Sequence, residues 1–453
     1  MGARRSPSGG VMNNQVIAEP TELNRSDYLA ALLASCGSAE SSKIGWLAEL
    51  RSRSIALIQE QAIPTMRDEE WRFTDLSALL QHSFQPAAGV VADSLVAAVK
   101  LPEAMNSRLT FVNGRYAPSL SNVTGLPANI FVGSLTQLSP AESDSLQQYC
   151  GQQPGYQEVF TALNTTALAD VAVVWVQKNQ IVNQPIHLLF ITVAGEMATI
   201  SQPRCLVVAE SGSSITLVQE YIATSEKVAV PYFCNSVTEV WLSENAEINH
   251  TRIQQESTNS FHVGKTAISQ AARSRYTINT ISLGAQLSRH NLEVFQTGEA
   301  TETTLNGLTK IGGVQISDTH SAIALNHPHG TTRQLHKCVV DDHARAIFNG
   351  KVLVPKAAQM TDAGQLNRNL LLSSKARIDT KPQLEITADN VKCSHGATVS
   401  QLEADEIFYL QSRGLDIINA RDLLINAFAT EIIVKIPVAS VREKLSVAVI
   451  NPF

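Results

Sequence analysis

Paired cysteines are absent from this chain of 453 residues. Its six cysteines are scattered, and no Cys-x-x-Cys spacing occurs among Cys36, Cys150, Cys205, Cys234, Cys338 and Cys393. In a chain of this length such scatter does not describe a disulfide framework. We therefore expect reduced thiols and a cytoplasmic location, or the plastid stroma if the source is a plant or alga.

Long apolar runs and an excess of basic charge are also absent. The longest apolar segments, such as residues 186–194, are strand-sized, whereas a membrane-spanning helix needs about 20 apolar residues. Residues 1–20 lack the apolar centre of a secretory signal, and we expect them to form a disordered tail. The formal net charge is −6, while nucleic-acid binders present a basic surface. These features argue against membrane and nucleic-acid partners.

Residue patterns typical of several enzyme classes are missing as well. No Gly-x-Ser-x-Gly motif occurs. Residues 264–266, Gly-Lys-Thr, resemble the end of a phosphate-binding loop, but Asn259 stands where that loop needs a glycine. Glycoside hydrolysis requires two carboxylates at one cleft, whereas the side chains of Asp341 and Asp342 would diverge. We expect that this chain is not an enzyme.

Short strand-like runs dominate the middle of the chain. Between about residues 151 and 400, apolar and polar residues alternate, as in residues 237–242 and 276–281, and small or polar turns separate the runs. This pattern predicts an all-β region without helices. A β-sandwich is one arrangement, but the many short runs and a weak quasi-repeat favour a parallel β-helix or similar solenoid.

The length of the chain predicts two or three domains. Residues 21–150 read as an N-terminal helical and α/β region, in which Leu29, Leu32 and Leu33 follow the helical period. We place its boundary with the predicted β-helix core, residues 151–400, near residue 150.

Residues 401–453 read as a C-terminal helical domain. Ser400 and Glu403 have the spacing of a capping box, which predicts a helix beginning at Ser400. Gly414 is expected to end that helix, and Asn419 to begin the next. An apolar stripe on such helices usually packs on its own domain, and docking into a partner's groove is the alternative.

Cys393 and His395 form the most informative pair of side chains. They lie two positions apart in a segment that reads as a strand, so both side chains are expected on one face. A thiol and an imidazole suit iron or zinc, but a structural zinc site usually needs four ligands. Either the pair is structural, or the missing ligands come from elsewhere, such as another protein.

Two further pairs of metal-ligating residue types have the same spacing. His327 and His329 flank a proline, and His336 and Cys338 are also two apart. So weak a pattern favours ordinary turn or surface roles for both pairs over metal binding.

The residues around Cys393 change this interpretation. The segment from Asp379 to Leu402, which contains Cys-Ser-His-Gly-Ala-Thr, resembles the SufD branch of the SufB/SufD family of the SUF iron–sulfur assembly system. Further matches, in the family's order, are Glu-Glu-Trp-Arg-Phe-Thr-Asp-Leu-Ser (69–77), Gln-Leu-His-Lys (334–337), Ala-Arg-Ala-Ile-Phe-Asn-Gly-Lys (344–351), Thr-Asp-Ala (361–363) and Asn-Arg-Asn-Leu-Leu-Leu-Ser (367–373). One departure is Ser400, where the family form is expected to have glycine. The resemblance covers most of the chain after residue 60.

This resemblance implies a fold, a role and two partners. The fold would be mainly β, a right-handed parallel β-helix core flanked by N-terminal α/β and C-terminal helical regions. The chain would be a scaffold subunit that pairs with SufB and supports cluster assembly and iron acquisition. His395, with Cys393, would line the interface and share a transient iron or cluster with SufB. No cofactor would be stably bound by the lone chain, a flavin could bind the complex, and the isolated chain could form a homodimer.

The resemblance also assigns the second partner to the C-terminal helices. In this family the ATPase SufC is held there, which implies SufC binding by residues 403–434. Tyr409, Arg413, Gly414 and Arg421 are the positions to test.

Two other functions remain open from the sequence. One is a stand-alone β-helical enzyme acting on a glycan or small molecule, which a carboxylate-lined groove would favour. The other is a SufB-like protein that builds a cluster on its own cysteines, which the scattered cysteines and the SufD-type motif disfavour.

Overall fold

The computed structural model describes residues 24–36, 44–87, 89, 91, 96, 99–225 and 228–450. The tail expected at residues 1–20 lies outside these ranges. Strands make up 40% of the structure and helices 24%. None of the helices in the described ranges is both long and apolar enough to cross a membrane.

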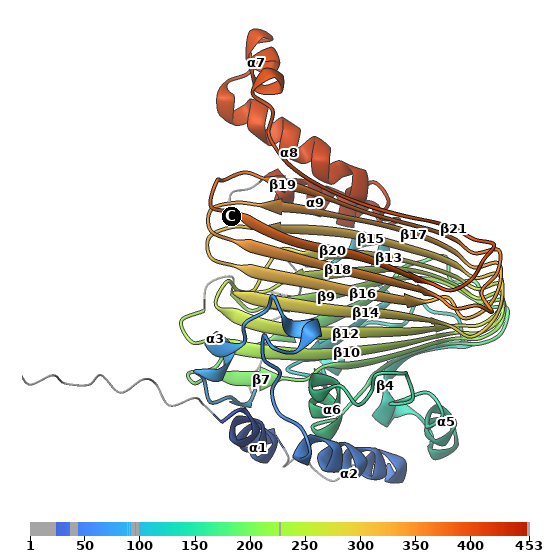
Figure 1. Ribbon diagram of the computed structural model, residues 1–453. Helices are drawn as coiled ribbons and strands as arrows, with labels where there is room; N and C mark the ends of the chain where they lie inside the picture. The colour runs from blue at the N-terminus through green and yellow to red at the C-terminus, as the bar shows by residue number, and fades with distance from the viewer. Residues whose placement is uncertain are drawn as a thin grey trace, which may run out of the picture.

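The strands form a parallel solenoid of about 8 turns, which confirms the predicted β-helix (Figure 1). Even-numbered strands build most of one sheet, in the order β20-β18-β16-β14-β12-β10-β8-β5-β4. Odd-numbered strands build most of the other, in the order β21-β19-β17-β15-β13-β11-β9-β6-β2-β3. Because successive strands alternate between the sheets, each coil of the chain stacks on the preceding one.

The bounds of the strands are as follows. The first sheet contains β4 (Ile130–Ser134), β5 (Ala172–Val176), β8 (Arg204–Ala209), β10 (Tyr232–Leu242), β12 (Ser260–Gln270), β14 (Leu287–Gln296), β16 (Ile316–Ala324), β18 (Arg345–Val354) and β20 (Arg377–Ile386), with β1 (Gln85–Pro86) and β7 (Thr199–Ser201) at its side. The second contains β2 (Arg108–Val112), β3 (Arg115–Tyr116), β6 (Ile186–Thr192), β9 (Ser214–Ala223), β11 (Glu247–Gln255), β13 (Arg275–Ser282), β15 (Glu302–Ile311), β17 (Thr331–Val340), β19 (Asp362–Leu371) and β21 (Lys392–Gln401).

The space between the two sheets, the lumen, holds both apolar and polar side chains. The apolar ones form the main core cluster, which includes Val240, Ile278 and Val352. Buried imidazoles lie among them and find partners within the lumen: His250 is the register neighbour of Ile278 and contacts the Tyr276 hydroxyl at 2.9 Å. Buried polar groups are costly unless paired, so these contacts stabilise one register of the coils.

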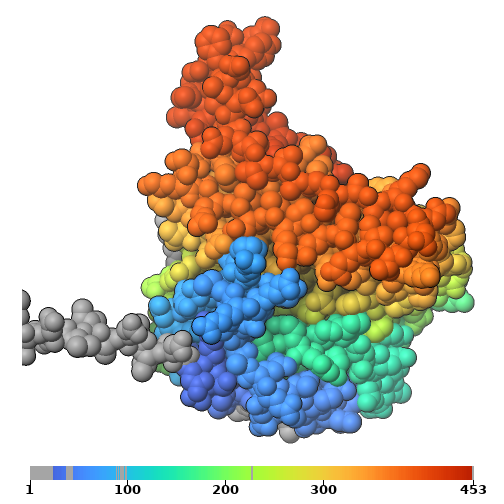
Figure 2. Space-filling model, in the orientation of Figure 1, coloured from blue at the N-terminus to red at the C-terminus, as the bar shows by residue number. Residues whose placement is uncertain are grey.

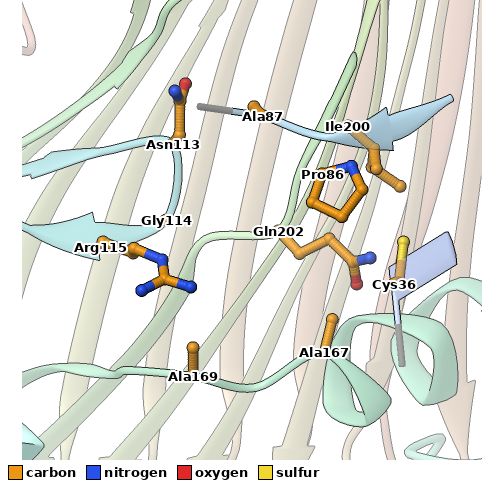
Figure 3. A pocket seen from close by; sticks show the side chains of 10 residues that line it. All are labelled: Cys36, Pro86, Ala87, Asn113, Gly114, Arg115, Ala167, Ala169, Ile200 and Gln202. Carbon is orange, nitrogen blue, oxygen red and sulfur yellow. The ribbon is translucent and has the colours of Figure 1, made fainter. Parts of the chain in front are cut away.

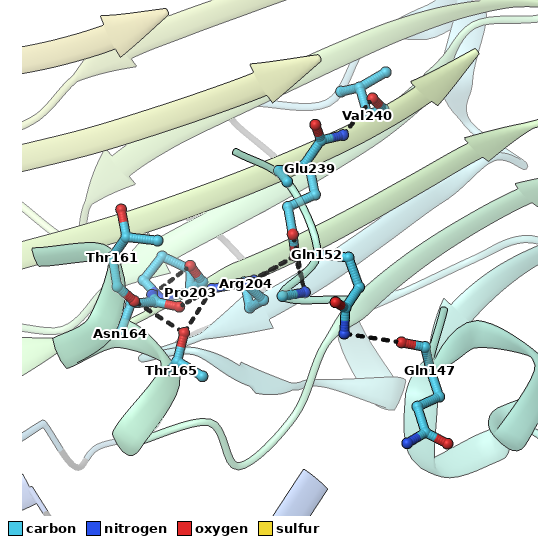
Figure 4. Close-up of polar contacts among 11 residues, drawn as sticks. Gln147, Gln152, Thr161, Asn164, Thr165, Pro203, Arg204, Glu239 and Val240 are labelled. Atoms are coloured by element: carbon cyan, nitrogen blue, oxygen red, sulfur yellow. Dashed lines mark hydrogen bonds and ion pairs between the residues drawn. The ribbon is translucent and has the colours of Figure 1, made fainter. Parts of the chain in front are cut away.

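The N-terminal helices cover the first coils and the side of the first sheet. They are α1 (Arg25–Cys36), α2 (Gly45–Gln59), α3 (Ser77–Leu80), α5 (Pro140–Leu146) and α6 (Val159–Thr166), with short 3₁₀ helices at Glu69–Trp71, Pro102–Ala104, Pro118–Leu120 and Leu135–Gln137. Buried Arg204 fastens α6 to the solenoid, because its guanidinium contacts Asn164, Thr165 and Glu239 (Figure 4).

The C-terminal helices are α7 (Ala404–Ser412), α8 (Ile417–Ile433) and α9 (Ala439–Ile450). The predicted capping box is wrong, since β21 continues to Gln401 and Glu403 is the N-cap of α7 without a side-chain cap hydrogen bond. The strand pairing overrides the local signal, because Ser400 pairs with Leu370 of β19. The second helix begins at Ile417, two residues before the predicted start, where Asp416 caps it.

Candidate functional site

The stack of coils ends in an open pair of strands, which we call the terminal rung: β20 and β21. Each strand is ten residues long and is hydrogen-bonded along one edge, to β18 and β19 respectively. Among the described residues, neither has a strand on its other edge. Figure 2 shows the last coils as a broad exposed face. Long unpaired strand edges are templates for pairing with another chain.

The rim of the terminal rung is partly apolar. Ile386 and Val399 continue inward-facing columns, because they pair with buried Val354 and Asn369 of the preceding coil. Nothing in the described chain stacks on them, and 38% of Ile386 and 51% of Val399 stay exposed. An open lumen with exposed apolar side chains is a surface that association with another protein would cover.

Cys393 and His395 lie in β21, as the sequence predicted, and occupy its inward-facing positions. Cys393 pairs with Ala363, is half-buried and packs against the main core cluster. Burial raises the pKa of its thiol above the ordinary value. His395 pairs with Gln365 and is exposed at the rim. The two side chains therefore differ: the imidazole is accessible, and the thiol is partly shielded and protonated at neutral pH.

A line of polar side chains runs through the lumen toward His395. The Gln334 side chain donates to the Ser321 hydroxyl at 2.7 Å, and the Gln365 amide donates to the Gln334 carbonyl oxygen at 2.8 Å. The Gln365 oxygen is buried without a partner, next to His395 in the register. Sequence reasoning missed Gln365. The available signal was the strand period, because Gln365 lies two positions after Ala363 and therefore on the same face of the strand.

An open groove of about 590 Å³ lies beside His395. It is lined by residues of β15, β17, β19 and β21, and by Lys435 after α8. Asp362 supplies the only carboxylate of this lining, and it is paired with Arg333 at 2.8 Å. A groove with one occupied carboxylate lacks the two acids that glycoside hydrolysis uses.

Cys393 and His395 offer one thiol and one imidazole, which suit iron but do not close a site. Within the part of the chain that the structure describes, the one group of three metal-ligating side chains lies elsewhere and includes neither residue. The geometry therefore agrees with an incomplete site at the rim, to which further ligands would have to be added.

The N-terminal segment 69–77 docks on the outer face of the first sheet. The Arg289 guanidinium lies 3.9 Å from the Trp71 ring centroid, and Arg289 also forms a buried ion pair with Asp318 at 2.5 Å. Glu69 reaches the terminal rung itself, where Lys381 of β20 contacts it at 3.0 Å. The segment thus braces the open end of the solenoid from outside.

The C-terminal helices α8 and α9 pack on the outer face of the second sheet. Their apolar side chains, including Ile432 and Leu445, join a cluster with Ile281 and Val339 of the strands. Glu431 of α8 adds ion pairs with Lys337 of β17 at 2.5 Å and with Arg368 of β19 at 3.5 Å. The common expectation that a terminal apolar stripe packs on its own domain therefore holds for this face.

Helix α7 projects away from the solenoid, and we call it with its link to α8, residues 404–416, the arm (Figure 1). None of the α7 residues is buried, and 72% of Phe408 and 56% of Tyr409 are exposed. Ile418, at the start of α8, is 69% exposed. Aromatic and aliphatic side chains exposed together on one projecting helix mark an interaction surface.

The four positions singled out for the second partner lie on or next to the arm. The Arg413 guanidinium donates to the Tyr409 hydroxyl at 3.1 Å and lies 5.3 Å from the centroid of that ring. Gly414 has a φ of 94°, which is the left-handed conformation predicted for a helix stop. Arg421 lies one turn into α8 and is half-buried. The structure brings Tyr409 and Arg413 together and leaves their functional role untested.

The other His and Cys pairs lie apart from the terminal rung. His336 and Cys338 are buried lumen residues of β17, so the turn or surface role expected for them is wrong. Period-2 alternation put their side chains inside the solenoid, where Gly307 leaves room for the imidazole. His329 lies in a turn with a positive φ of 60°, as expected. Gly264 lies in β12, not in a phosphate-binding loop.

A smaller pocket of about 110 Å³ lies under the N-terminal region (Figure 3). Cys36 of α1, Gln202 and Arg115 line it together with small residues and Pro86. This pocket shares no lining residue with the groove beside His395. The terminal rung and the arm are therefore the candidate functional surfaces.

Comparison with known proteins agrees with this architecture. The family described as "SUF system FeS cluster assembly, SufBD core domain" matches residues 190–428, and the "SufBD protein N-terminal region" matches residues 25–188. An iron–sulfur cluster assembly SufBD family protein of Synechocystis is 52% identical, covering 88% of this chain and 89% of its own.

Two further relatives are more distant. Protein ABCI7, chloroplastic, of Arabidopsis thaliana is 34% identical over 92% of this chain and 88% of its own. The iron–sulfur cluster assembly protein SufD of Escherichia coli is 32% identical over 82% and 84%. Since two family profiles and these relatives cover most of its length, the chain belongs to the SufBD family of the SUF system for iron–sulfur cluster assembly.

Proposed function

We propose that this chain is a non-catalytic scaffold subunit of a SUF assembly complex. It pairs with SufB through the terminal rung and binds the ATPase SufC through the arm. The observation that carries the proposal is the open end of the solenoid, where two ten-residue strand edges and the pair Cys393 and His395 lie on the same rim. Membership of the family agrees with an assembly role.

The terminal rung suits a partner that is itself a β-solenoid. Two parallel edges lie side by side at one end of the stack, so a partner with the same pair of edges continues both sheets across the interface. Exposed Ile386 and Val399 would be buried by it. In the absence of SufB, a second copy of this chain is the nearest substitute, so the isolated protein would form a homodimer.

Cys393 and His395 then supply part of an iron site that SufB completes. Iron, or a nascent cluster, is cargo in this scheme, and the lone chain holds no resident cofactor. His395 is the stronger ligand of the two, because it is exposed while burial raises the pKa of the Cys393 thiol. The complex would act in the cytoplasm, or in the stroma of a plastid. We assign no flavin to this chain, and a flavin in the complex would need contributions from its partners.

The arm is the proposed contact with SufC. Phe408 and Tyr409 present apolar area on a helix that the solenoid does not cover. Arg413 is held over the Tyr409 ring, which reduces the side-chain entropy lost on binding. Since α8 anchors the arm on the second sheet, movement of bound SufC during ATP turnover would be transmitted to the solenoid.

A co-expression experiment tests both contacts separately. The chain would be produced with SufB and SufC as wild type, His395→Ala and Phe408→Ala/Tyr409→Ala, with His343→Ala as the matched exposed-histidine control. Size-exclusion chromatography reports the complex, and iron and sulfide content after reconstitution reports the cluster.

The expected results differ between the variants. His395→Ala should keep the complex and lose most of the cluster, the double arm variant should lose SufC and keep SufB, and His343→Ala should match wild type. A wild-type chain that co-purifies with neither partner would refute the scaffold role. A full cluster in His395→Ala would refute the ligand role of His395 and leave the scaffold role standing.

A further inference from the structure

A second group of metal-ligating side chains lies inside the solenoid, among its early coils. Cys234 of β10, Glu256 in the turn after β11 and His262 of β12 have ligand atoms that all lie within 4.8 Å of one another. Cys234 and His262 are directly paired neighbours on adjacent strands. Only 1% of Cys234, 5% of Glu256 and 1% of His262 is exposed. The group is independent of the terminal rung, which begins more than a hundred residues later in the sequence.

The carboxylate of Glu256 is only half used within the protein. Its Oε2 atom lies 2.5 Å from His262 Nδ1 and accepts from the Gln254 amide at 3.1 Å. Its Oε1 atom is buried and has no hydrogen-bond partner. An unpaired carboxylate oxygen in a dry interior costs free energy that a bound cation would recover.

The three donor atoms match one class of ion. A thiolate sulfur, an imidazole nitrogen and a carboxylate oxygen together are typical ligands of Zn²⁺ or Fe²⁺, and calcium or magnesium would prefer oxygen alone. Three protein ligands leave one tetrahedral position open, for water or for a neighbouring hydroxyl. The negative charges of the thiolate and the carboxylate together balance the charge of a bound divalent ion.

The surroundings can hold the imidazole in the orientation that a metal on Nδ1 requires. The Ser236 hydroxyl lies 3.2 Å from His262 Nε2 and can accept its proton, as second-shell partners of metal-bound histidines do. Arg252 now contacts the same nitrogen at 2.6 Å. The Arg252 guanidinium also lies 5.0 Å from the centroid of the Tyr221 ring. When His262 Nε2 becomes a donor and no longer accepts from Arg252, that ring face can still stabilise the positive charge of the guanidinium.

The space around the imidazole is provided by Gly264. A Cβ at this position would lie 2.8 Å from His262 Nε2 and 2.9 Å from both the Arg252 guanidinium and the Ser236 hydroxyl. The glycine of the segment that resembles a phosphate-binding loop therefore makes room for this cluster. Glu256 lies in the turn after β11, in which Thr258, two residues further on, is exposed.

We propose that Cys234, Glu256 and His262 bind one divalent transition-metal ion, Zn²⁺ or Fe²⁺, inside the solenoid. The ion displaces the thiol proton of Cys234, which is released to the solvent, and His262 keeps its single proton by moving it from Nδ1 to Nε2. This site ties β10, β11 and β12 together and is separate from the site that receives iron as cargo at the terminal rung.

The metal content of the untagged, full-length chain tests this site. Cells would be grown with added Zn²⁺ or Co²⁺, so that the ion is available while the chain folds, and bound metal would be measured by elemental mass spectrometry. Cobalt adds a spectroscopic signature, since a thiolate ligand gives a charge-transfer band in the near ultraviolet. Wild type is expected to retain about one ion per chain after dialysis against a weak chelator, with the cobalt–thiolate band.

Matched variants locate the ion. Losing even an outer-shell partner of a metal ligand typically costs about 10–100-fold in affinity, so Cys234→Ala and Glu256→Gln, which alter ligands themselves, should lower the bound metal at least about tenfold. Cys338→Ala, which removes another fully buried lumen thiol, and Cys393→Ala/His395→Ala should retain it. Circular dichroism and size exclusion would show that each variant is folded. Glu256→Gln, which preserves the shape of the side chain, serves if Cys234→Ala does not fold.

Three outcomes would overturn the proposal. One is wild-type protein that contains no metal after growth in either supplement. Another is metal that persists in both Cys234→Ala and Glu256→Gln. The third is metal that disappears with Cys393→Ala/His395→Ala, which would place the ion at the terminal rung. None of these results depends on whether SufB or SufC binds the chain.

Discussion

The buried ion pair between Arg204 of β8 and Glu239 of β10 should contribute strongly to stability, and it holds the guanidinium that contacts Asn164 and Thr165 of α6. The guanidinium and carboxylate are 1% and 2% exposed and 2.6 Å apart. Glu239 also accepts from the backbone N–H of Gly151, at 2.9 and 3.0 Å to its two oxygens. Replacing Arg204 by Met removes the positive charge but keeps most of the apolar volume, which leaves the carboxylate buried with the backbone donor as its remaining partner.

The expected cost follows from that uncompensated charge. Removing one member of a buried ion pair typically destabilises a protein by about 3–5 kcal/mol. Arg204→Met/Glu239→Leu should recover much of the loss, because neither charge then remains buried. Arg275→Met is the matched control. Its pair with Glu247 is 52% and 33% exposed, so the cost should be at most about 1 kcal/mol.

Urea unfolding followed by far-ultraviolet circular dichroism at neutral pH measures these differences. The double variant should have a midpoint between those of Arg204→Met and wild type. The reasoning would be refuted if Arg204→Met fell within about 1 kcal/mol of the Arg275→Met control, or if the double variant were no more stable than Arg204→Met.

Two further predictions concern the elements packed on the outside of the sheets. Leu445→Ala removes a fully buried side chain between α9 and the second sheet and should lower the free energy of unfolding in urea by about 2–5 kcal/mol. Val447→Ala, at a 61% exposed position, should change that free energy by less than about 0.5 kcal/mol. Equal effects of the two changes would contradict the packing. Burial alone would lower the pKa of His320, but Asp318 outweighs burial and raises that pKa above the ordinary value. The stabilisation from His320 should therefore be complete below about pH 6.5 and be lost as pH rises through the raised folded-state pKa. The difference in free energy of unfolding between wild type and His320→Gln should then narrow at alkaline pH. A difference that widens there would contradict this sign.

Period-2 alternation was sufficient to predict an all-β region, and the many short runs, the weak quasi-repeat and the family resemblance favoured the solenoid over a sandwich. The same alternation placed Cys393 and His395 in one strand. The capping box at Ser400 failed for a related reason: Ser400 pairs with Leu370 in a ten-residue ladder, and that ladder outweighs one local side-chain hydrogen bond.

The partners of a lumen residue were beyond local sequence reasoning. Cys234 and Glu256 are 22 positions apart, and their proximity depends on the coil length and on the register between β10 and β12. The burial of His336 likewise follows from its place in the stack. Residues that meet only because two coils have equal lengths leave no short motif behind.

If the arm binds SufC as proposed, the ion pairs of Glu431 in α8 connect that contact with the strands behind the rim. Glu431 forms ion pairs with Lys337 on β17 and with Arg368 on β19. These two strands also carry Gln334 and Gln365, the two glutamines that lead to His395. The arm is therefore connected, through α8, to the two strands behind the rim. A force applied at Phe408 would reach β17 and β19 through Glu431, and it would also reach β9 of the early coils through the ion pair of Lys444 of α9 with Glu220.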